Sequence, residues 1–276
     1  MRTGVAQHAA CRLLYLLPCL LFAACTSPSP RPDLDAAARR GFAETRFPTQ
    51  LFTLFGLYHP GAGAVLHVYI EGDGHAWDAP HRPSSDPTPR NPVALRLALA
   101  DPGCGPVLYL ARPCQFVRGT ERRNCAVRWW TSARLGTDVI VALDEAVTQA
   151  KNRAGAARVA LFGFSGGGGA AALLAARRDD VAFLGTVAGL LDTKAWTARM
   201  HVSPLAASLN PLDVAVRLRA LPQLHLCSRD DTTMPPEISA GFCAAAGRTD
   251  SRVVVEGMPH GGAWETLWPE LLARQP

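Results

Sequence analysis

A serine between glycines is the feature of this sequence that most directly suggests chemistry. The sequence GFSGG, centred on Ser165, follows the apolar run 158–164 and leads at once into the small-residue stretch 166–178. When a strand turns abruptly into a helix, the serine between them is strained, and glycines flank it because a Cβ there would collide with the neighbouring chain. The helix start also brings free N–H groups and a positive dipole end to the serine oxygen. The pattern predicts that Ser165 is a nucleophile.

A nucleophilic serine needs a general base, and the base needs an acid that orients it. Asp231 follows the apolar run 221–227, and His260 follows the run 252–256, so both side chains are expected on loops after late strands. Asp230 stays open as an alternative to Asp231 because the two are adjacent. The sequence therefore predicts His260 as the base and Asp231 as its orienting acid.

The order of these motifs resembles that of the α/β-hydrolases, over about residues 50–273. A YIEGDG loop, the GFSGGG turn, a DDTTMP stretch and a GMPHGG turn follow one another in the family's order. The stretch that begins at Asp231 is similar to the D-x-x-V-P of many members, with Met in place of Val. The sequence also resembles uncharacterised bacterial lipoprotein hydrolases that pair a YIEGDG loop with an RPCQ segment, here residues 112–115. The resemblance implies an esterase- or lipase-like serine hydrolase and indicates no substrate.

Acyl transfer requires two donors for the oxyanion. One is expected to be the N–H of Gly166, the residue after the nucleophile. The resemblance implies that the other is the N–H of Asp73 in the loop 71–75, where Gly72 permits a close turn and Glu71 replaces the histidine of many lipases and esterases. The acids and the histidine of this loop are an alternative metal site, but they are too few and too local, so no metal is predicted.

Short apolar runs alternate with helical stretches along the chain, which favours a mostly parallel central sheet with helices on both faces. We therefore predict an α/β-hydrolase fold. The expected strands are 51–58, 64–70, 106–111, 158–164, 181–189, 221–227 and 252–256, and the expected helices are 138–153, 166–178 and a last one from about 262.

The N-terminus is typical of an exported protein. Residues 1–24 combine basic residues, a short apolar run and small residues at the end, which predicts a signal peptide. The sequence FAAC, ending at Cys25, resembles a bacterial lipobox in which Phe22 departs from the preferred smaller aliphatic residue. The resemblance implies a lipidated Cys25 and, because Thr26 is not aspartate, anchoring in the outer membrane. The alternative is an ordinary signal peptide that releases a soluble periplasmic or secreted protein.

A Pro-rich linker is expected over residues 25–40, followed by a hydrolase domain over 41–276. Within this domain an oxidising compartment would allow disulfides. Cys114 and Cys125 bracket a polar loop and are one expected pair. Cys227 and Cys243 are a second, which leaves Cys104 over, either as a free thiol or as a sign of a different pairing.

Composition excludes several other classes of protein. The 276 residues are 48% hydrophobic with a net charge of +5, as in globular proteins, and show no Lys/Arg cluster with interleaved aromatics, so nucleic-acid binding is not expected. The glycine-rich segment lacks the lysine of a phosphate-binding loop, and the next strand lacks the acid of a dinucleotide site. No cofactor is predicted.

The predicted function is hydrolysis of carboxylic esters through a Ser-His-Asp triad and an acyl-enzyme, with a small-molecule or lipid ester as substrate and the membrane reached through the lipid anchor. A peptidase or an acyltransferase on the same triad is one alternative. A non-catalytic envelope lipoprotein that uses the fold as a binding module is another. Four tryptophans could line an apolar acyl pocket, although packing explains each equally well: Trp77, Trp129, Trp130 and Trp196. The sequence does not indicate an oligomeric state.

Overall fold

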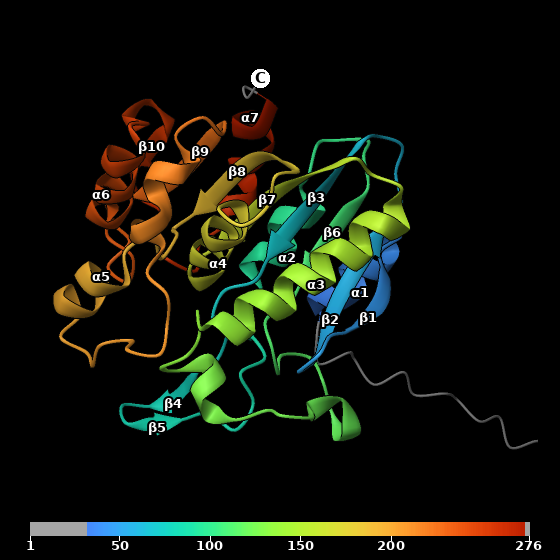
Figure 1. Cartoon of the computed structure of the whole chain (residues 1–276), viewed down its shortest axis with the longest axis horizontal. Helices are drawn as coiled ribbons and strands as arrows, with labels where there is room; N and C mark the ends of the chain where they lie inside the picture. The colour runs from blue at the N-terminus through green and yellow to red at the C-terminus, as the bar shows by residue number, and fades with distance from the viewer. Residues whose placement is uncertain (1–31, 274–276) are drawn as a thin grey trace, which may run out of the picture. The chain divides into compact units, whose positions relative to one another are not determined.

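A computed structural model of the chain describes residues 32–273 (Figure 1). The predicted signal peptide and Cys25 lie outside the described residues. Within residues 32–273, eight strands form the main sheet, and β4 (Trp77–Ala79) and β5 (Arg82–Pro83) form a separate hairpin. The strands of the main sheet are β1 (Ala43–Pro48), β2 (Thr53–His59), β3 (Val65–Ile70), β6 (Val107–Leu110), β7 (Arg158–Phe164), β8 (Val181–Val187), β9 (Gln223–Ser228) and β10 (Arg252–Val255).

The sheet is mostly parallel. Its order is β1-β2-β6-β3-β7-β8-β9-β10, and antiparallel pairing occurs where β2 meets β1 and β6. All pairs from β6 through β3 to β10 are parallel. The arrows of β3 and β8 point toward the side of the molecule that carries the β4–β5 hairpin (Figure 1). Loops that follow the parallel strands therefore meet at one edge of the sheet, where this class of sheet places its sites.

Helices cover both faces of the sheet. Packed together on one face are α3 (Thr137–Ala154), α4 (Gly166–Ala175), the 3₁₀ helix η3 (Pro211–Leu218) and α6 (Pro236–Ala246). On the other are α1 (Pro32–Arg39), α2 (Val93–Leu99), the 3₁₀ helix η5 (Trp264–Thr266) and α7 (Trp268–Ala273). The short helix α5 (Thr193–Arg199) lies beyond the end of β8. Helix α3 has Gly136 as its N-cap, carries Asp138 in its first turn and is capped at its C-terminal end by Gly155 in the left-handed conformation, as helix-end preferences favour.

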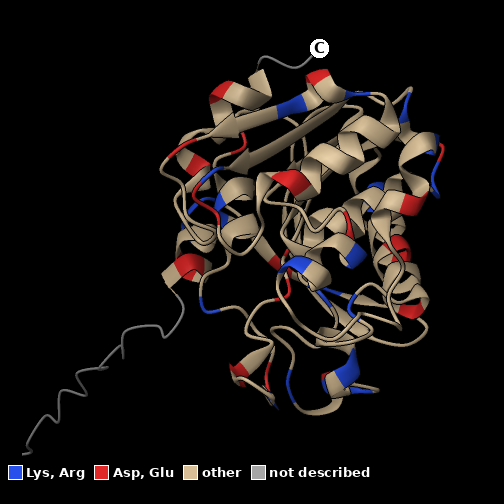
Figure 2. Ribbon diagram, turned by 90° about the vertical axis from the view of Figure 1, so that its left-hand side faces the viewer, with Lys and Arg blue, Asp and Glu red and all other residues tan. Residues whose placement is uncertain are grey.

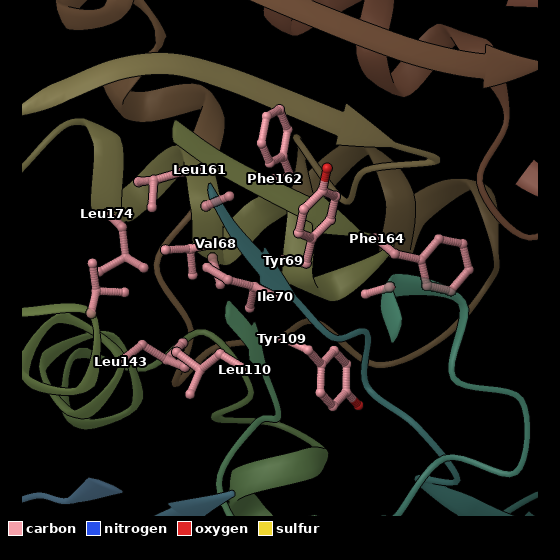
Figure 3. Packing of buried hydrophobic residues seen from close by; sticks show 14 of the residues in the cluster. Val68, Tyr69, Ile70, Tyr109, Leu110, Leu143, Leu161, Phe162, Phe164 and Leu174 are labelled. Atoms are coloured by element: carbon pink, nitrogen blue, oxygen red, sulfur yellow. The ribbon is translucent and has the colours of Figure 1, made fainter. Parts of the chain in front are cut away.

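The core of the molecule surrounds the central strands. On one side of β3, Val68 and Ile70 lie near Leu161 of β7 (Figure 3). On the other side, Tyr69 stacks on Phe162 with ring centroids 4.7 Å apart. Both faces of β3 and β7 are buried, which explains why these strands are continuous apolar runs in the sequence.

Several elements differ from the sequence prediction. Residues 32–39, which we expected in the Pro-rich linker, form helix α1 with Ala37 fully buried. Pro32 stands at its first position, where proline is tolerated because that N–H has no helical partner. Strand β1 and the β4–β5 hairpin were not expected, since neither has an apolar run.

The cysteines match one predicted pairing and contradict the other. The structure contains a disulfide between Cys114 and Cys125. The predicted pair of Cys227 and Cys243 is wrong, because both are buried free thiols, Cys227 in β9 and Cys243 in α6. Burial raises the pKa of each thiol, that of Cys243 to about 11, which disfavours the reactive thiolate form. Cys104 is free and exposed.

Acidic and basic residues are interspersed along the described chain rather than gathered by sign (Figure 2). Among residues 32–273, no helix is long and apolar enough to cross a bilayer. The same residues contain no group of three His, Cys, Asp or Glu side chains placed to bind a metal ion.

Candidate active site

Ser165 stands at the sharp turn between β7 and α4. Its backbone angles, φ 52° and ψ −122°, lie in a region that residues with a side chain rarely adopt. The turn depends on glycine, since a Cβ on Gly163 would collide with the carbonyl of Gly167, and a Cβ on Gly167 with the carbonyl of Ile70. The sequence motif therefore produces the strained turn that it predicted.

His260 lies on the loop between β10 and η5 and reaches back to the serine. Its Nε2 is 3.1 Å from Ser165 Oγ, and its ring lies 4.9 Å from that of Phe164, the residue before the serine. The carbonyl of His260 accepts a hydrogen bond from the indole of the buried Trp264 at 2.8 Å, which fixes the loop against the core. The imidazole remains about one-fifth exposed, so it faces both protein and solvent.

Asp231, and not Asp230, contacts the imidazole. Asp231 Oδ2 is 2.7 Å from His260 Nδ1, and this side chain is fully buried. Its Oδ1 accepts the backbone N–H groups of Thr233 at 2.9 Å and Met234 at 2.7 Å, which hold the carboxylate in one orientation. The Asp230 carboxylate instead accepts the N–H of Gly257 at 2.6 Å. The two adjacent acids therefore have separate partners.

The loop 71–75 passes beside the serine, as the resemblance implied. A Cβ on Gly72 would lie 3.4 Å from Ser165 Cβ, and one on Gly166 would collide with the Asp73 carboxylate. Glycine at both positions thus permits the close approach. No acceptor among the described residues takes the N–H of Gly166 or that of Asp73.

The RPCQ segment, residues 112–115, is hydrogen-bonded to this loop. Gln115 is buried; its Nε2 donates to the carbonyl of Gly72 at 3.0 Å, and its Oε1 accepts the N–H of Arg112 at 3.0 Å. The neighbouring Cys114 and Phe116 both have positive φ, and Cys114 forms the disulfide with Cys125. The segment that carried part of the family resemblance therefore shapes the predicted oxyanion loop.

Two arginines accompany the Asp73 carboxylate. Arg134 Nη1 is 2.6 Å from Oδ2, and Arg112 Nη1 is 3.6 Å from Oδ1. Both arginine side chains are nearly buried, and burial lowers the pKa of Arg112. Arg134 also donates from Nε to the carbonyl of Thr131 at 2.7 Å. Sequence reasoning missed both arginines, because no local signal links residues 112 and 134 to residue 73.

Glu71 is a fully buried carboxyl at the start of the same loop. Its Oε1 accepts the N–H of Gly72 at 2.8 Å, and its Oε2 is 3.2 Å from the hydroxyl of Tyr109. Burial raises the pKa of Glu71 from 4.5 to about 7, although these hydrogen bonds partly offset that effect. The Glu71 carboxyl therefore holds its proton to a higher pH than a solvent-exposed glutamate does.

Ser165 and His260 line a pocket of about 550 Å³, a size typical of small-ligand sites, and Asp231 lies buried behind His260. Ser165, His260 and the loop 71–75 form its floor, and its walls include Arg90, Arg134, Leu190, Trp196 and Met234. Of the four tryptophans considered from sequence, Trp77 and Trp196 line this pocket. Trp129 and Trp130 are buried and line no part of it.

Two further histidines, in β9 and β3, have partners away from this pocket. His225 is fully buried in β9 beside Thr186 and Gln223, and burial lowers its pKa to about 3. His67 pairs with Asp101 at 2.7 Å. Neither lines the pocket that contains Ser165.

Comparison with known proteins identifies the fold. No protein-family model and no curated protein sequence matches this chain. Among solved structures, an alpha-beta serine hydrolase homologue from Coxiella burnetii superimposes with a TM-score of 0.59 at 17% identity, over 84% of this chain and 96% of that one. An esterase from Pyrococcus furiosus gives a TM-score of 0.57 at 14% identity, over 84% of this chain and 90% of that one.

Larger proteins named as a hydrolase or a peptidase share the same fold. A puromycin hydrolase gives a TM-score of 0.61 at 19% identity, over 84% of this chain, and this chain spans 37% of its length. An acylaminoacyl peptidase from Pyrococcus horikoshii gives 0.61 at 14% identity, over 88% of this chain and 43% of that one. The chain therefore has the α/β-hydrolase fold, as its strand order and its Ser165 turn also indicate.

Proposed function

We propose that this protein is a serine hydrolase that cleaves carboxylic esters through Ser165, His260 and Asp231. The observation that supports the proposal is the continuous hydrogen-bond chain from Ser165 Oγ through both ring nitrogens of His260 to Asp231, at 3.1 and 2.7 Å. This series of hydrogen bonds begins at a strained serine that lines the pocket and ends at a buried carboxylate. A nucleophile, a base and an orienting acid within hydrogen-bond reach are the arrangement that acyl transfer requires.

The first step is attack by Ser165 Oγ on the acyl carbon of the ester. His260 Nε2 takes the hydroxyl proton as the new bond forms. Asp231 accepts the Nδ1–H of the imidazole, which keeps Nε2 unprotonated before attack and stabilises the imidazolium afterwards. The backbone N–H groups that hold Asp231 in place keep this orientation fixed throughout.

The carbonyl oxygen gains negative charge in this step. The N–H groups of Gly166 and Asp73 are the proposed donors, because they flank the serine and bond to no other acceptor in the described part of the chain. Gly166 is also the first residue of α4, whose dipole favours negative charge at that end. Donors that are already oriented stabilise the transition state without reorganising.

Collapse of the tetrahedral intermediate breaks the bond to the alcohol, and His260 Nε2–H protonates the departing oxygen. Water then enters, loses a proton to the same nitrogen and attacks the acyl-enzyme. The second collapse releases the acid and returns the proton to Ser165. The same groups would serve an amide substrate or transfer to another alcohol, which only assays distinguish.

Hydrolysis of p-nitrophenyl butyrate by the full-length protein tests the proposal. Ser165→Ala and His260→Ala should each lower kcat/KM by about 10⁴-fold or more, with folding unchanged. His59→Ala, at the far end of β2, is the matched control and should retain wild-type activity. A folded wild-type protein with no activity on esters, aminoacyl p-nitroanilides or acyl acceptors would favour the non-catalytic binding module instead.

We also propose that the protein is exported and anchored through a lipid on Cys25. The FAAC sequence supports this, as does the Cys114–Cys125 disulfide, because such bonds persist in oxidising compartments. Growth with labelled palmitate should label the wild-type protein and not Cys25→Ser. Equal labelling of both would refute the anchor, and unlabelled wild-type protein in the periplasm or medium would support an ordinary signal peptide.

A further inference from the structure

A second pocket of about 600 Å³ adjoins the one that contains Ser165. It lies between the β4–β5 hairpin, the segment 131–134 and the segment that follows α5. Most of its larger lining side chains are apolar: Trp77, Pro80, Trp196, Val202, Pro204 and Leu205. No proposed catalytic residue lines it.

The two pockets share four lining residues, Trp77, Arg134, Trp196 and Val202. Trp196 is held in place, because its indole N–H donates to the carbonyl of Thr233 at 2.8 Å, two residues beyond the triad acid. Arg134 is held by its bonds to Asp73 and to the carbonyl of Thr131. Two of the four shared residues are therefore bonded to the loops that carry Asp231 and Asp73.

Two of the shared residues are large apolar side chains left open to water. Trp77 is 43% exposed and Val202 is 48% exposed. Exposed apolar surface that adjoins a cavity is typical of ligand-binding grooves. Among the residues that line the second pocket, Arg134 is the one Lys, Arg, Asp or Glu, and Asp73 offsets its charge.

We infer that the second pocket is a subsite for an apolar group of the substrate, so that the enzyme prefers esters carrying a long hydrocarbon or aromatic group. This inference rests on the proposed ester hydrolysis at Ser165. The reacting carbonyl occupies the first pocket, and the apolar group passes Trp77 and Val202 into the second. The preference for such esters comes from the free energy gained when the apolar group leaves water. Charged or short substrates gain no binding free energy from the subsite.

The test compares kcat/KM across two ester series with the full-length protein. One is p-nitrophenyl acetate, butyrate and octanoate; the other is ethyl and octyl acetate, followed by titration of the released acid. In at least one series, kcat/KM should rise with chain length, by up to roughly fourfold for each CH₂ that enters the subsite. No rise in either series would overturn the inference.

Substitutions at the second pocket test whether the rise of kcat/KM with chain length arises there. Ser132 is exposed and lines the second pocket but not the first, so Ser132→Trp should fill it and lower the long-to-short ratio of kcat/KM at least tenfold. Val202→Asp, at an exposed position shared by the two pockets, should lower the long-to-short ratio because it places a charge where the apolar group passes. Ser85→Trp, at an exposed serine that lines neither pocket, should keep the wild-type ratio.

The outcomes separate the subsite from the proposed function. Hydrolysis of p-nitrophenyl acetate with a long-to-short ratio that neither Ser132→Trp nor Val202→Asp changes would overturn the subsite and leave the ester hydrolase intact. Failure of the wild-type protein to hydrolyse any ester of either series would overturn both. A ratio that Ser85→Trp lowers as much as Ser132→Trp would also overturn the subsite.

Discussion

The buried carboxyl of Glu71 should make the stability of this protein depend on pH. Burial raises its pKa from 4.5 in the unfolded chain to about 7 in the folded protein. Between these values the folded protein keeps a proton that the unfolded chain has lost, so the free energy of unfolding falls as the pH rises. At about 1.4 kcal/mol per pH unit, the loss sums to roughly 3 kcal/mol.

Glu71→Gln removes this dependence, because an amide does not ionise. The stability of the variant relative to the wild type should therefore increase by roughly 3 kcal/mol between pH 4.5 and pH 8. Below pH 4.5 both chains are neutral at this position, and their difference is constant. Above pH 7 the wild-type carboxylate is charged in both states, and the difference is constant again.

Urea unfolding followed by tryptophan fluorescence at five pH values measures this difference. Other titrating groups are common to both proteins and cancel. Glu256→Gln is the matched control, because that side chain is 80% exposed and solvent hydrates it in both states, so its difference should be flat. A flat difference for Glu71→Gln as well would refute the argument that burial dominates at Glu71.

The remaining predictions concern the proposed acid, the oxyanion donor and the disulfide. Asp231→Asn should lower kcat/KM for ester hydrolysis by about 10⁴-fold and Asp230→Asn by less than about tenfold, and equal losses would contradict the assignment of the acid. Gly166→Ala should lower kcat about 100-fold because its Cβ meets a neighbouring carboxylate, whereas Gly241→Ala, which meets open space, should leave kcat unchanged. Replacing both cysteines of the disulfide by serine should lower the free energy of unfolding in urea by roughly 3 kcal/mol, as expected for a short loop, whereas Cys104→Ser, at an exposed free thiol, should not change it.

Buried parallel strands were predictable because their environment dictates their composition. The strand 158–164 has the predicted bounds, and the helix expected at 138–153 spans Thr137–Ala154. Both faces of such a strand are covered, so it must be apolar throughout. The β1 strand lies at the sheet edge with polar, exposed residues, and its formation depends on pairing with β2 rather than on an apolar pattern.

The individual motifs of the site were visible in the sequence because each is local. The serine turn requires neighbouring glycines, and Asp231 and His260 each follow an apolar run. Their common hydrogen-bond chain follows from the parallel sheet, which brings the ends of β7, β9 and β10 to one edge. Arg134 and Gln115 could not be found in this way, since each reaches the loop 71–75 only through tertiary packing.

The cysteines also show that contacts which depend on tertiary packing are hard to predict from sequence. Cys114 and Cys125 are close in sequence, and the loop between them brings their Cα atoms to 5.7 Å, within the range that a disulfide spans. Cys227 and Cys243 lie in a strand and in the helix that covers it, and both are buried free thiols; Cys227 Sγ contacts the carbonyl of Val253. Two cysteines can lie in neighbouring elements without having their sulfur atoms within bonding distance.

The central claim is that Ser165 is an activated nucleophile, and covalent labelling tests it most directly. Folded wild-type protein is treated with a fluorophosphonate, which reacts with serines activated by a neighbouring base, and the adduct is located by mass spectrometry of its peptides. The account predicts one adduct, on Ser165, absent from Ser165→Ala and formed much more slowly in His260→Ala. A folded wild-type protein without an adduct, or with the adduct on a different residue, would contradict it.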